Sequence, residues 1–244
     1  MTDIQRLPTG AAMRFVPAPG TGPAERRATI LVVHGWTSTP FSSPTYTSLI
    51  EGLGRHGFNI ALMSLRGHEG TDEDINSVTR DQHLADIAAA IDFMTAHPNV
   101  DPARCGALGV SYGAYLLSIA QDRSKLRFKA IAFRAPALYP NERWEEPIAV
   151  LTGGPMHSWR LDSHVNDGNA ALNAIGSFTG QLLIVASEND THVPEQTVMD
   201  YRACATRAPS SVFVLHGATH VLDAEQRNAF LAKIIPWFSC ALQD

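Results

Sequence analysis

Residues 105–120 read CGALGVSYGAYLLSIA, and Gly109-Val110-Ser111-Tyr112-Gly113 within them form the pattern G-x-S-x-G. The first six residues of this stretch predict a buried strand and the last six predict a helix, so Ser111 falls on the turn between them. A sharp turn from strand to helix lifts the serine oxygen out of the sheet, where a base can reach it. A β-carbon at either flanking glycine would crowd the strand and helix that pass this bend. Ser111 is therefore the first candidate for a catalytic nucleophile.

Strand and helix signals alternate along the rest of the chain. The apolar runs are continuous, which is typical of strands covered on both faces in a parallel sheet. Helical stretches lie between them, so the predicted class is α/β, with a mostly parallel central sheet flanked by helices. The predicted strands are 29–33, 58–63, 105–110, 130–133, 182–186 and 211–215, the predicted helices lie near 44–56, 80–96, 112–122, 195–207 and 223–239, and Arg14–Val16 is expected as an extra edge strand because prolines bracket it.

The alternation is interrupted at residues 138–178, which are rich in Gly, Pro, Asn, Trp and His. A connection of this length is usually functional or an insertion with short helices of its own, so we expect a lid or cap here. Surface padding is the alternative. A length of 244 residues is compatible with one hydrophobic core, and residues 1–244 are expected to form a single domain that contains this insertion.

Composition and charge exclude several classes of partner. A formal net charge of -5 without a concentrated basic surface argues against nucleic acid. The polar N-terminus and the absence of an ~18-residue apolar run argue against a membrane, so we expect a cytoplasmic protein. The three cysteines (Cys105, Cys204 and Cys240) are scattered without C-x-x-C spacing, which predicts free thiols.

A serine nucleophile needs a base and a residue that orients the base, and candidates for both follow predicted strands. Asp190 comes just after the run 182–186, and His220 comes after the run 211–215. Open parallel sheets present ligand-facing groups at the carboxyl ends of their strands. The sequence therefore predicts that Ser111, Asp190 and His220 meet at one edge of the sheet.

From about residue 28 to its C-terminus the chain resembles the α/β-hydrolase superfamily of serine hydrolases, in which the triad follows the order Ser, Asp, His. Its general pattern is similar to carboxylesterases of the cinnamoyl-esterase type and to dienelactone hydrolases, although the latter use cysteine where this chain has Ser111. The marks of the resemblance are His34-Gly35-Trp36, Arg66-Gly67-His68, the turn at 109–113, Glu188-x-Asp190-x-x-Val193-Pro194 and Gly217-Ala218-x-His220.

The resemblance implies a role for each candidate. Ser111 is expected as nucleophile, His220 as general base and acid, and Asp190 as the carboxylate that holds the imidazole. The backbone N–H groups of Tyr112 and Trp36 are expected to form the oxyanion hole.

Other residues near these motifs have less specific signals. His34 is interpreted as a packing residue that braces the loop before Trp36. Trp144, Met156, His157 and Trp159 in the insertion are predicted to line the substrate pocket, with anchoring of the insertion as an equal alternative for the aromatic residues.

Two rival interpretations of the polar residues are less consistent with the sequence. His216, His220 and His192 could be grouped as a metal cluster, but their spacing does not match a helical H-E-x-x-H site, so no metal and no other cofactor is expected. Glu188 could replace Asp190 as the triad acid, but neighbouring extended residues point to opposite sides.

The predicted function is hydrolysis of small to medium carboxylic esters through an acyl-enzyme on Ser111, with a small-molecule ester as the partner. A thioesterase, an amidase or peptidase, and a carbon-carbon bond hydrolase use the same triad and stay open. A non-catalytic binding protein of the same fold is a further alternative, but it would not need Asp190 and His220.

Overall fold

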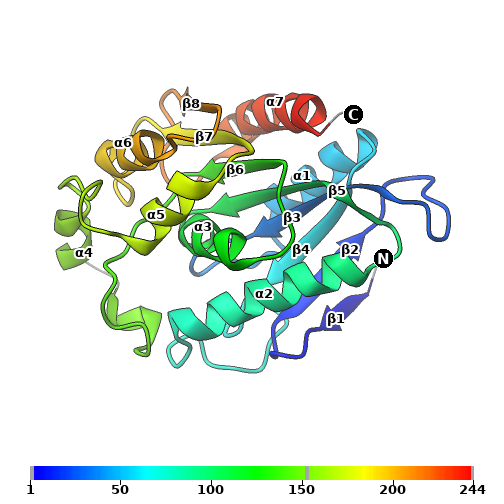
Figure 1. Cartoon of the computed structure of the whole chain (residues 1–244), viewed down its shortest axis with the longest axis horizontal. Helices are drawn as coiled ribbons and strands as arrows, with labels where there is room; N and C mark the ends of the chain where they lie inside the picture. The colour runs from blue at the N-terminus through cyan, green and yellow to red at the C-terminus, as the bar shows by residue number, and fades with distance from the viewer. Residues whose placement is uncertain (1–2, 152–153, 243–244) are drawn as a thin grey trace.

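A computed structural model of the chain describes residues 3–151 and 154–242. Within them an eight-stranded sheet is built in the order β1-β2-β4-β3-β5-β6-β7-β8 (Figure 1). The strands from β4 to β8 in this order pair in parallel, whereas β2 runs antiparallel to both of its neighbours, β1 and β4. The strands are β1 (Ile4–Arg6), β2 (Ala12–Val16), β3 (Arg27–Val33), β4 (Asn59–Ser64), β5 (Val100–Val110), β6 (Ala130–Arg134), β7 (Gln181–Ser187) and β8 (Ser210–Leu215).

Helices cover both faces of the sheet. Helices α2, α3, α5 and α6 pack over one face, where Figure 1 shows α2, α3 and α5 in front of the strands, and α1 and α7 pack over the other. The helices are α1 (Pro44–Arg55), α2 (Arg80–Ala96), α3 (Tyr112–Arg123), α4 (Gly154–Trp159), α5 (Ala170–Ser177), α6 (Glu195–Cys204) and α7 (Ala224–Ala241), and η1 (Ile148–Leu151) is a short 3-10 helix.

The apolar runs are continuous because their strands are covered on both faces, as predicted. Along β3, Leu31 and Val33 join the core under α2 and α3, while Ile30 and Val32 join the core under α1 and α7. Because successive side chains of a strand point to opposite faces, a strand buried on both sides has to be apolar at every position. The predicted α/β class and its mostly parallel sheet are confirmed.

The two edges of the sheet differ from the expectation. One edge strand is β1, which the sequence pattern does not predict, and β2 lies one position further in. Strand β8 occupies the opposite edge, where Val214 is exposed instead of covered on both faces. An edge strand has one neighbour and less helix above it, so its apolar residues are less buried than the sequence pattern suggests.

Residues 138–178 contain η1, α4 and α5, and residues 152 and 153 of this segment lie outside the described residues. Its last helix, α5, is part of the main body because Leu172 and Ile175 are buried against the core around α3. The part before α5 stays beside the carboxyl ends of the strands. Among the helices that the structure describes, none is both long and apolar enough to span a bilayer.

Candidate active site

Ser111 lies at the junction of β5 and α3, as the N-cap residue of the helix. Its backbone angles are φ 51° and ψ −115°, in the region of positive φ that L-residues rarely adopt. Backbone hydrogen bonds hold this conformation: the Ser111 N–H donates to the Arg134 carbonyl (2.8 Å), and the Ser111 carbonyl accepts from the N–H groups of Ala114 (3.0 Å), Ala137 (3.1 Å) and Tyr115 (3.3 Å). Backbone strain of this kind persists only where the surroundings enforce it, and it is frequent at functional sites.

The glycines on both sides of Ser111 are required by close contacts. A β-carbon at Gly109 would lie 2.5 Å from the Ala114 Cα, and one at Gly113 would collide with the backbone carbonyl oxygens of Val33 and His34. Helix α3 therefore passes directly over β3 and β5, which brings its first turn to the end of the sheet. This is the steric reason for glycine that the sequence pattern suggested.

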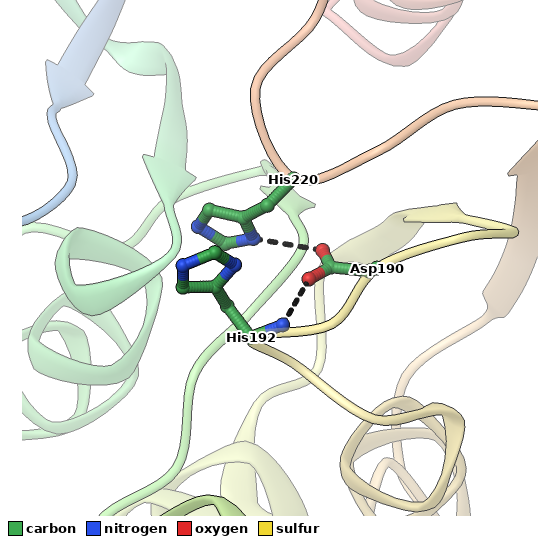
Figure 2. A group of neighbouring side chains, drawn as sticks. All are labelled: Asp190, His192 and His220. Atoms are coloured by element: carbon green, nitrogen blue, oxygen red, sulfur yellow. Dashed lines mark hydrogen bonds and ion pairs between the residues drawn. The ribbon is translucent and has the colours of Figure 1, made fainter. Parts of the chain in front are cut away.

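Asp190 and His220 meet at the carboxyl ends of the strands, where Ser111 also lies. They come from the loops after β7 and β8. The Nδ1 atom of His220 lies 2.7 Å from Asp190 Oδ2, and Figure 2 shows the two side chains facing each other. The other carboxylate oxygen, Oδ1, accepts hydrogen bonds from the backbone N–H groups of His192 and Val193, each 2.9 Å long. The carboxylate is thus fixed by its own loop and directed at the imidazole.

Opposing influences act on the pKa of the Asp190 carboxyl. Burial raises its pKa, but the hydrogen bond and charge of His220 and the N–H groups of Val193 and His192 together lower it below its ordinary value. Asp190 is therefore an anion at neutral pH. An anionic acceptor at Nδ1 keeps the proton on that nitrogen and leaves Nε2 of His220 free to take a proton.

The structure brings Asp190, and not Glu188, to His220. The Glu188 carboxylate is exposed and accepts a hydrogen bond from the Gly217 N–H (2.7 Å), and its other oxygen lies 3.5 Å from Nδ1 of His216. Asp190, His192 and His220 do place potential metal-ligand atoms within 4.8 Å of one another. A metal ion bound by these three residues would have to displace the hydrogen bond between Asp190 and His220. That catalysis needs no metal stays a prediction.

The amides expected to form the oxyanion hole have no competing acceptor. Within residues 3–151 and 154–242, neither the Trp36 nor the Tyr112 N–H donates a hydrogen bond. The Tyr112 amide belongs to the first turn of α3, where backbone donors have no partner in the helix. Gly35 lets the Trp36 loop approach, because a β-carbon there would come within 3.3 Å of the Ser111 Cβ.

His34 is fully buried and braces this loop, as interpreted from the sequence. Its Nδ1 lies 2.8 Å from the Gly35 carbonyl, and its Nε2 accepts the Leu65 N–H at 3.0 Å. Burial keeps the pKa of His34 well below its ordinary value, so the ring is neutral and donates through Nδ1. Its role is to fix the loop that carries the Trp36 amide.

A cavity of about 640 Å³ opens beside Ser111 and His220. Trp36 and His157, both predicted as site residues, contribute to its lining. Residues from the cores on both faces of the sheet also contribute, such as Leu49 and Tyr139. The cavity thus extends to both sides of the nucleophile and has the size of a small-molecule site.

Trp144 and Trp159 do not line this cavity, contrary to the prediction. The ring of Trp144 stacks on Tyr115 at 6.1 Å between centroids, and the Arg80 guanidinium lies 4.3 Å from its centre. The ring of Trp159 stacks on His164 at 3.6 Å. Trp144 thus attaches the 138–178 segment to the body, which is the alternative that the sequence left open, whereas the stack of Trp159 on His164 lies within the segment itself.

Several polar side chains that line the cavity were not identified as such from the sequence, among them Tyr46, Arg134, Arg160 and His192. The ring of His192 lies over that of His220, with 4.9 Å between centroids (Figure 2). Arg134 had a detectable signal, because it is a charged residue at the carboxyl end of an otherwise apolar strand. Tyr46 and Arg160 come from helix and loop segments whose place beside the nucleophile depends on the tertiary fold.

Comparison with known proteins agrees with this geometry. A model of the prolyl oligopeptidase family matches residues 44–244. The chain belongs to this family. It is a serine hydrolase with the α/β-hydrolase fold.

The individual relatives are distant. Acylamino-acid-releasing enzyme 2 of Oryza sativa subsp. japonica is 26% identical over 117 residues, which cover 46% of this chain but only 15% of that protein. Est1E from Butyrivibrio proteoclasticus, solved with ferulic acid bound, has a TM-score of 0.74 at 16% identity and aligns over 99% of each chain. The monoacylglycerol lipase of Paleococcus ferrophilus has a TM-score of 0.68 at 14% identity, over 98% of this chain and 100% of that one. Likeness at these identities shows a shared fold.

Proposed function

We propose that the chain is an esterase that cleaves small to medium carboxylic esters through an acyl-enzyme on Ser111. The observation that carries the proposal is the 2.7 Å hydrogen bond between Asp190 and His220, in a cavity that His220 and Ser111 both line. A base with a fixed tautomer in the same cavity as a serine on a strained turn is the arrangement that nucleophilic catalysis needs.

The proposed reaction has two stages. Ser111 Oγ attacks the ester carbonyl carbon while Nε2 of His220 takes its proton, and the oxyanion accepts hydrogen bonds from the amides of Trp36 and Tyr112. Collapse of this intermediate breaks the bond to the alcohol, which leaves with the proton from His220. Water then attacks the acyl-enzyme by the same steps and releases the acid. Asp190 stays ionised and stabilises the imidazolium in both stages.

Two observations favour an ester over a peptide. The monoacylglycerol lipase of P. ferrophilus aligns with this chain over nearly the full length of both proteins. In addition, among the described residues no Asp or Glu side chain lines the cavity, so no carboxylate there would pair with the free ammonium group of a peptide.

Peptide cleavage is the second candidate, because the family model and the rice acylamino-acid-releasing enzyme both point to it. The blocked N-terminus of an acylated peptide carries no ammonium group, so the cavity does not disfavour such a substrate. The same triad would cleave the amide bond.

Steady-state kinetics on matched substrates distinguish the two candidates. We expect kcat/KM for para-nitrophenyl butyrate to exceed that for acetyl-alanine para-nitroanilide by at least about a hundredfold, with Ser111→Ala as the blank. A higher value for the anilide would assign the chain to the peptidases. Added chelator is expected to change neither rate.

A further inference from the structure

Arg134 is a buried cation beside the candidate nucleophile. It is the last residue of β6, its carbonyl accepts the Ser111 N–H, and its side chain lines the cavity with only 3% of its surface exposed. Burial lowers the pKa of the guanidinium to about 10, which still leaves it positively charged at neutral pH. A buried charge is normally paired or fully hydrogen-bonded.

The guanidinium of Arg134 is anchored at one nitrogen and unsatisfied at the others. Its Nη2 donates to Ser187 Oγ (2.9 Å) and to the carbonyl oxygens of His220 (2.9 Å) and Thr219 (3.1 Å). Its Nε and Nη1 are shielded from solvent and have no acceptor among the described residues. The side chain is therefore held at the His220 loop with donors to spare, and each unsatisfied buried donor is costly unless something accepts from it.

Arg160 is a second buried cation of the same cavity. Its Nε donates to the Leu138 carbonyl (2.8 Å), its Nη1 donates to the His192 carbonyl (3.2 Å), and its guanidinium lies 4.5 Å from the centre of the Tyr139 ring. The remaining nitrogen, Nη2, is buried without an acceptor in the described part of the chain. Arg160 thus repeats the pattern of Arg134, with neutral partners and an unused donor.

The charge of the cavity is unbalanced. Within the described residues neither arginine has a carboxylate within ion-pair distance, although the chain as a whole carries a net charge of -5. The charge of Asp190 raises the pKa of Arg134 and so partly opposes the effect of burial, but the carboxylate oxygens of Asp190 are already used by His220 and by backbone N–H groups. A positive site with unused donors favours an anionic ligand, and hydrogen bonds from guanidinium to a carboxylate are charge-assisted and strong.

We propose that the substrate carries a free carboxylate that binds Arg134 in the cavity, with Arg160 contributing to the positive field. The inference rests on the proposed function and specifies its substrate class: esters with a carboxylate in the acyl part or in the alcohol part. Arg134 then connects binding of the carboxylate to the proposed triad, because its Nη2 atom holds the loop of His220 while its Nε and Nη1 atoms have no acceptor among the described residues.

Matched pairs of esters test the proposal. Mono-para-nitrophenyl adipate and its methyl ester differ only by a carboxylate in the acyl part, and 4-acetoxybenzoate and its methyl ester differ by one in the alcohol part. We expect the wild-type chain to prefer the charged member in one of the two pairs. In Arg134→Gln this preference, as a ratio of kcat/KM values, should fall by about ten- to a hundredfold, because a charge-assisted hydrogen bond is lost. Arg134→Lys should retain part of it.

A control separates recognition from structural support. Ser187→Ala removes one acceptor from the anchored nitrogen but leaves the guanidinium in place, so it should change both members of a pair equally. An unchanged charged-to-neutral ratio in Arg134→Gln, or a wild-type preference for the neutral member in both pairs, would overturn the inference.

Binding to a non-reacting variant makes the test independent of turnover. Ser111→Ala should bind monomethyl adipate more tightly than dimethyl adipate by calorimetry, and adding Arg134→Gln should abolish the difference. Equal binding of the two probes by Ser111→Ala would contradict the inference even if esters are cleaved. If no ester is cleaved but monomethyl adipate still binds through Arg134, the esterase proposal fails and the carboxylate site stands.

Discussion

Ser111 holds a backbone conformation that is costly for any residue with a β-carbon. The hydrogen bonds to Arg134, Ala114 and Ala137 enforce it, and the result is a side chain that projects from the end of the sheet into the cavity. At the scale of single residues, the site therefore depends on how each functional group is held. Ser111 is held by backbone strain, Asp190 by two amides, and His220 by Asp190.

Substitutions in the proposed triad should have large and unequal effects. We predict that Ser111→Ala and His220→Ala each lower kcat by about 10⁴-fold or more, because the triad acts as a unit. Asp190→Asn should be somewhat milder, since it disturbs the tautomer and orientation of His220 but leaves the nucleophile in place. Initial rates on a para-nitrophenyl ester measure all three.

Glu188→Gln is the matched control for Asp190→Asn. Its amide oxygen can still accept the Gly217 N–H, and it does not contact His220, so activity should stay within about twofold of the wild type. Equal losses of activity in Glu188→Gln and Asp190→Asn would contradict the assignment of Asp190 as the triad acid.

The sequence predicted the chemistry of single residues better than their recognition roles. Ser111, Asp190 and His220 follow strands, so their convergence could be deduced from parallel-sheet geometry alone. Arg160 and Tyr46 reach the cavity only because their segments fold back over the ends of the strands, and no local pattern encodes that contact. The sequence also gives no sign that Arg134 has unused donors, because this depends on which hydrogen-bond acceptors surround its side chain in the folded chain.

At the scale of elements, some residues of the segment 138–178 attach it to the body and others line the cavity. Arg80 is completely buried and donates to Tyr115 Oη (3.0 Å) and to the carbonyls of Pro140 (2.7 Å) and Glu142, while Trp144 stacks over it. The sequence identified the segment as unusual from its length and composition. It could not tell anchoring tryptophans from pocket tryptophans, because both functions select the same residue type.

Substitution of the anchors should change stability more than specificity. We predict that Trp144→Ala lowers the free energy of unfolding by about 2–3 kcal/mol, less than for a fully buried tryptophan because the ring is half-buried. Its activities on short and long acyl esters should fall together. Chemical denaturation and a panel of esters from acetate to octanoate measure the two effects.

Met156→Ala is the comparison within the same segment, because Met156 lines the cavity. It should shift kcat/KM between short and long acyl chains by about tenfold, the range of one or two methylene contacts in an apolar pocket. A change of acyl preference in Trp144→Ala, with none in Met156→Ala, would mean that the two roles have been exchanged.

At the scale of the whole molecule, the fold keeps several histidines buried and uncharged. Burial lowers the pKa of His83 to about 3, and burial also lowers the pKa of His34 and His68 beside it. His83 joins the start of α3 to the loop after β4, because its ring nitrogens lie 2.9 Å from the Tyr112 hydroxyl and from the Arg66 carbonyl. The alternation of strands and helices in the sequence was sufficient to predict the sheet around this cluster, but not which histidines it would bury.

These histidines should make the protein less stable in acid. Below the unfolded-state pKa of ~6.5, the unfolded chain binds protons that the folded chain does not, so stability is complete above this pH and is lost as the pH falls toward the folded pKa. His83 alone should contribute a loss of about 1.4 kcal/mol per pH unit between pH 6.5 and 4. The measurement is the free energy of unfolding in urea from pH 7 to 5.

In His83→Gln the free energy of unfolding should fall less steeply with decreasing pH, by the contribution given above for His83. The control His216→Gln, at an exposed residue, should keep the wild-type slope. The same slope in all three proteins would show that His83 titrates in the folded state as it does in the unfolded chain.

The claim that Ser111 forms the acyl-enzyme is tested most directly by intact-protein mass spectrometry after reaction with a fluorophosphonate, followed by peptide mapping. We predict a single adduct on Ser111, its loss in Ser111→Ala and in His220→Ala, and a parallel loss of ester hydrolysis as the adduct forms. An adduct on another residue, or full ester hydrolysis by a chain whose Ser111 is quantitatively labelled, would contradict the account.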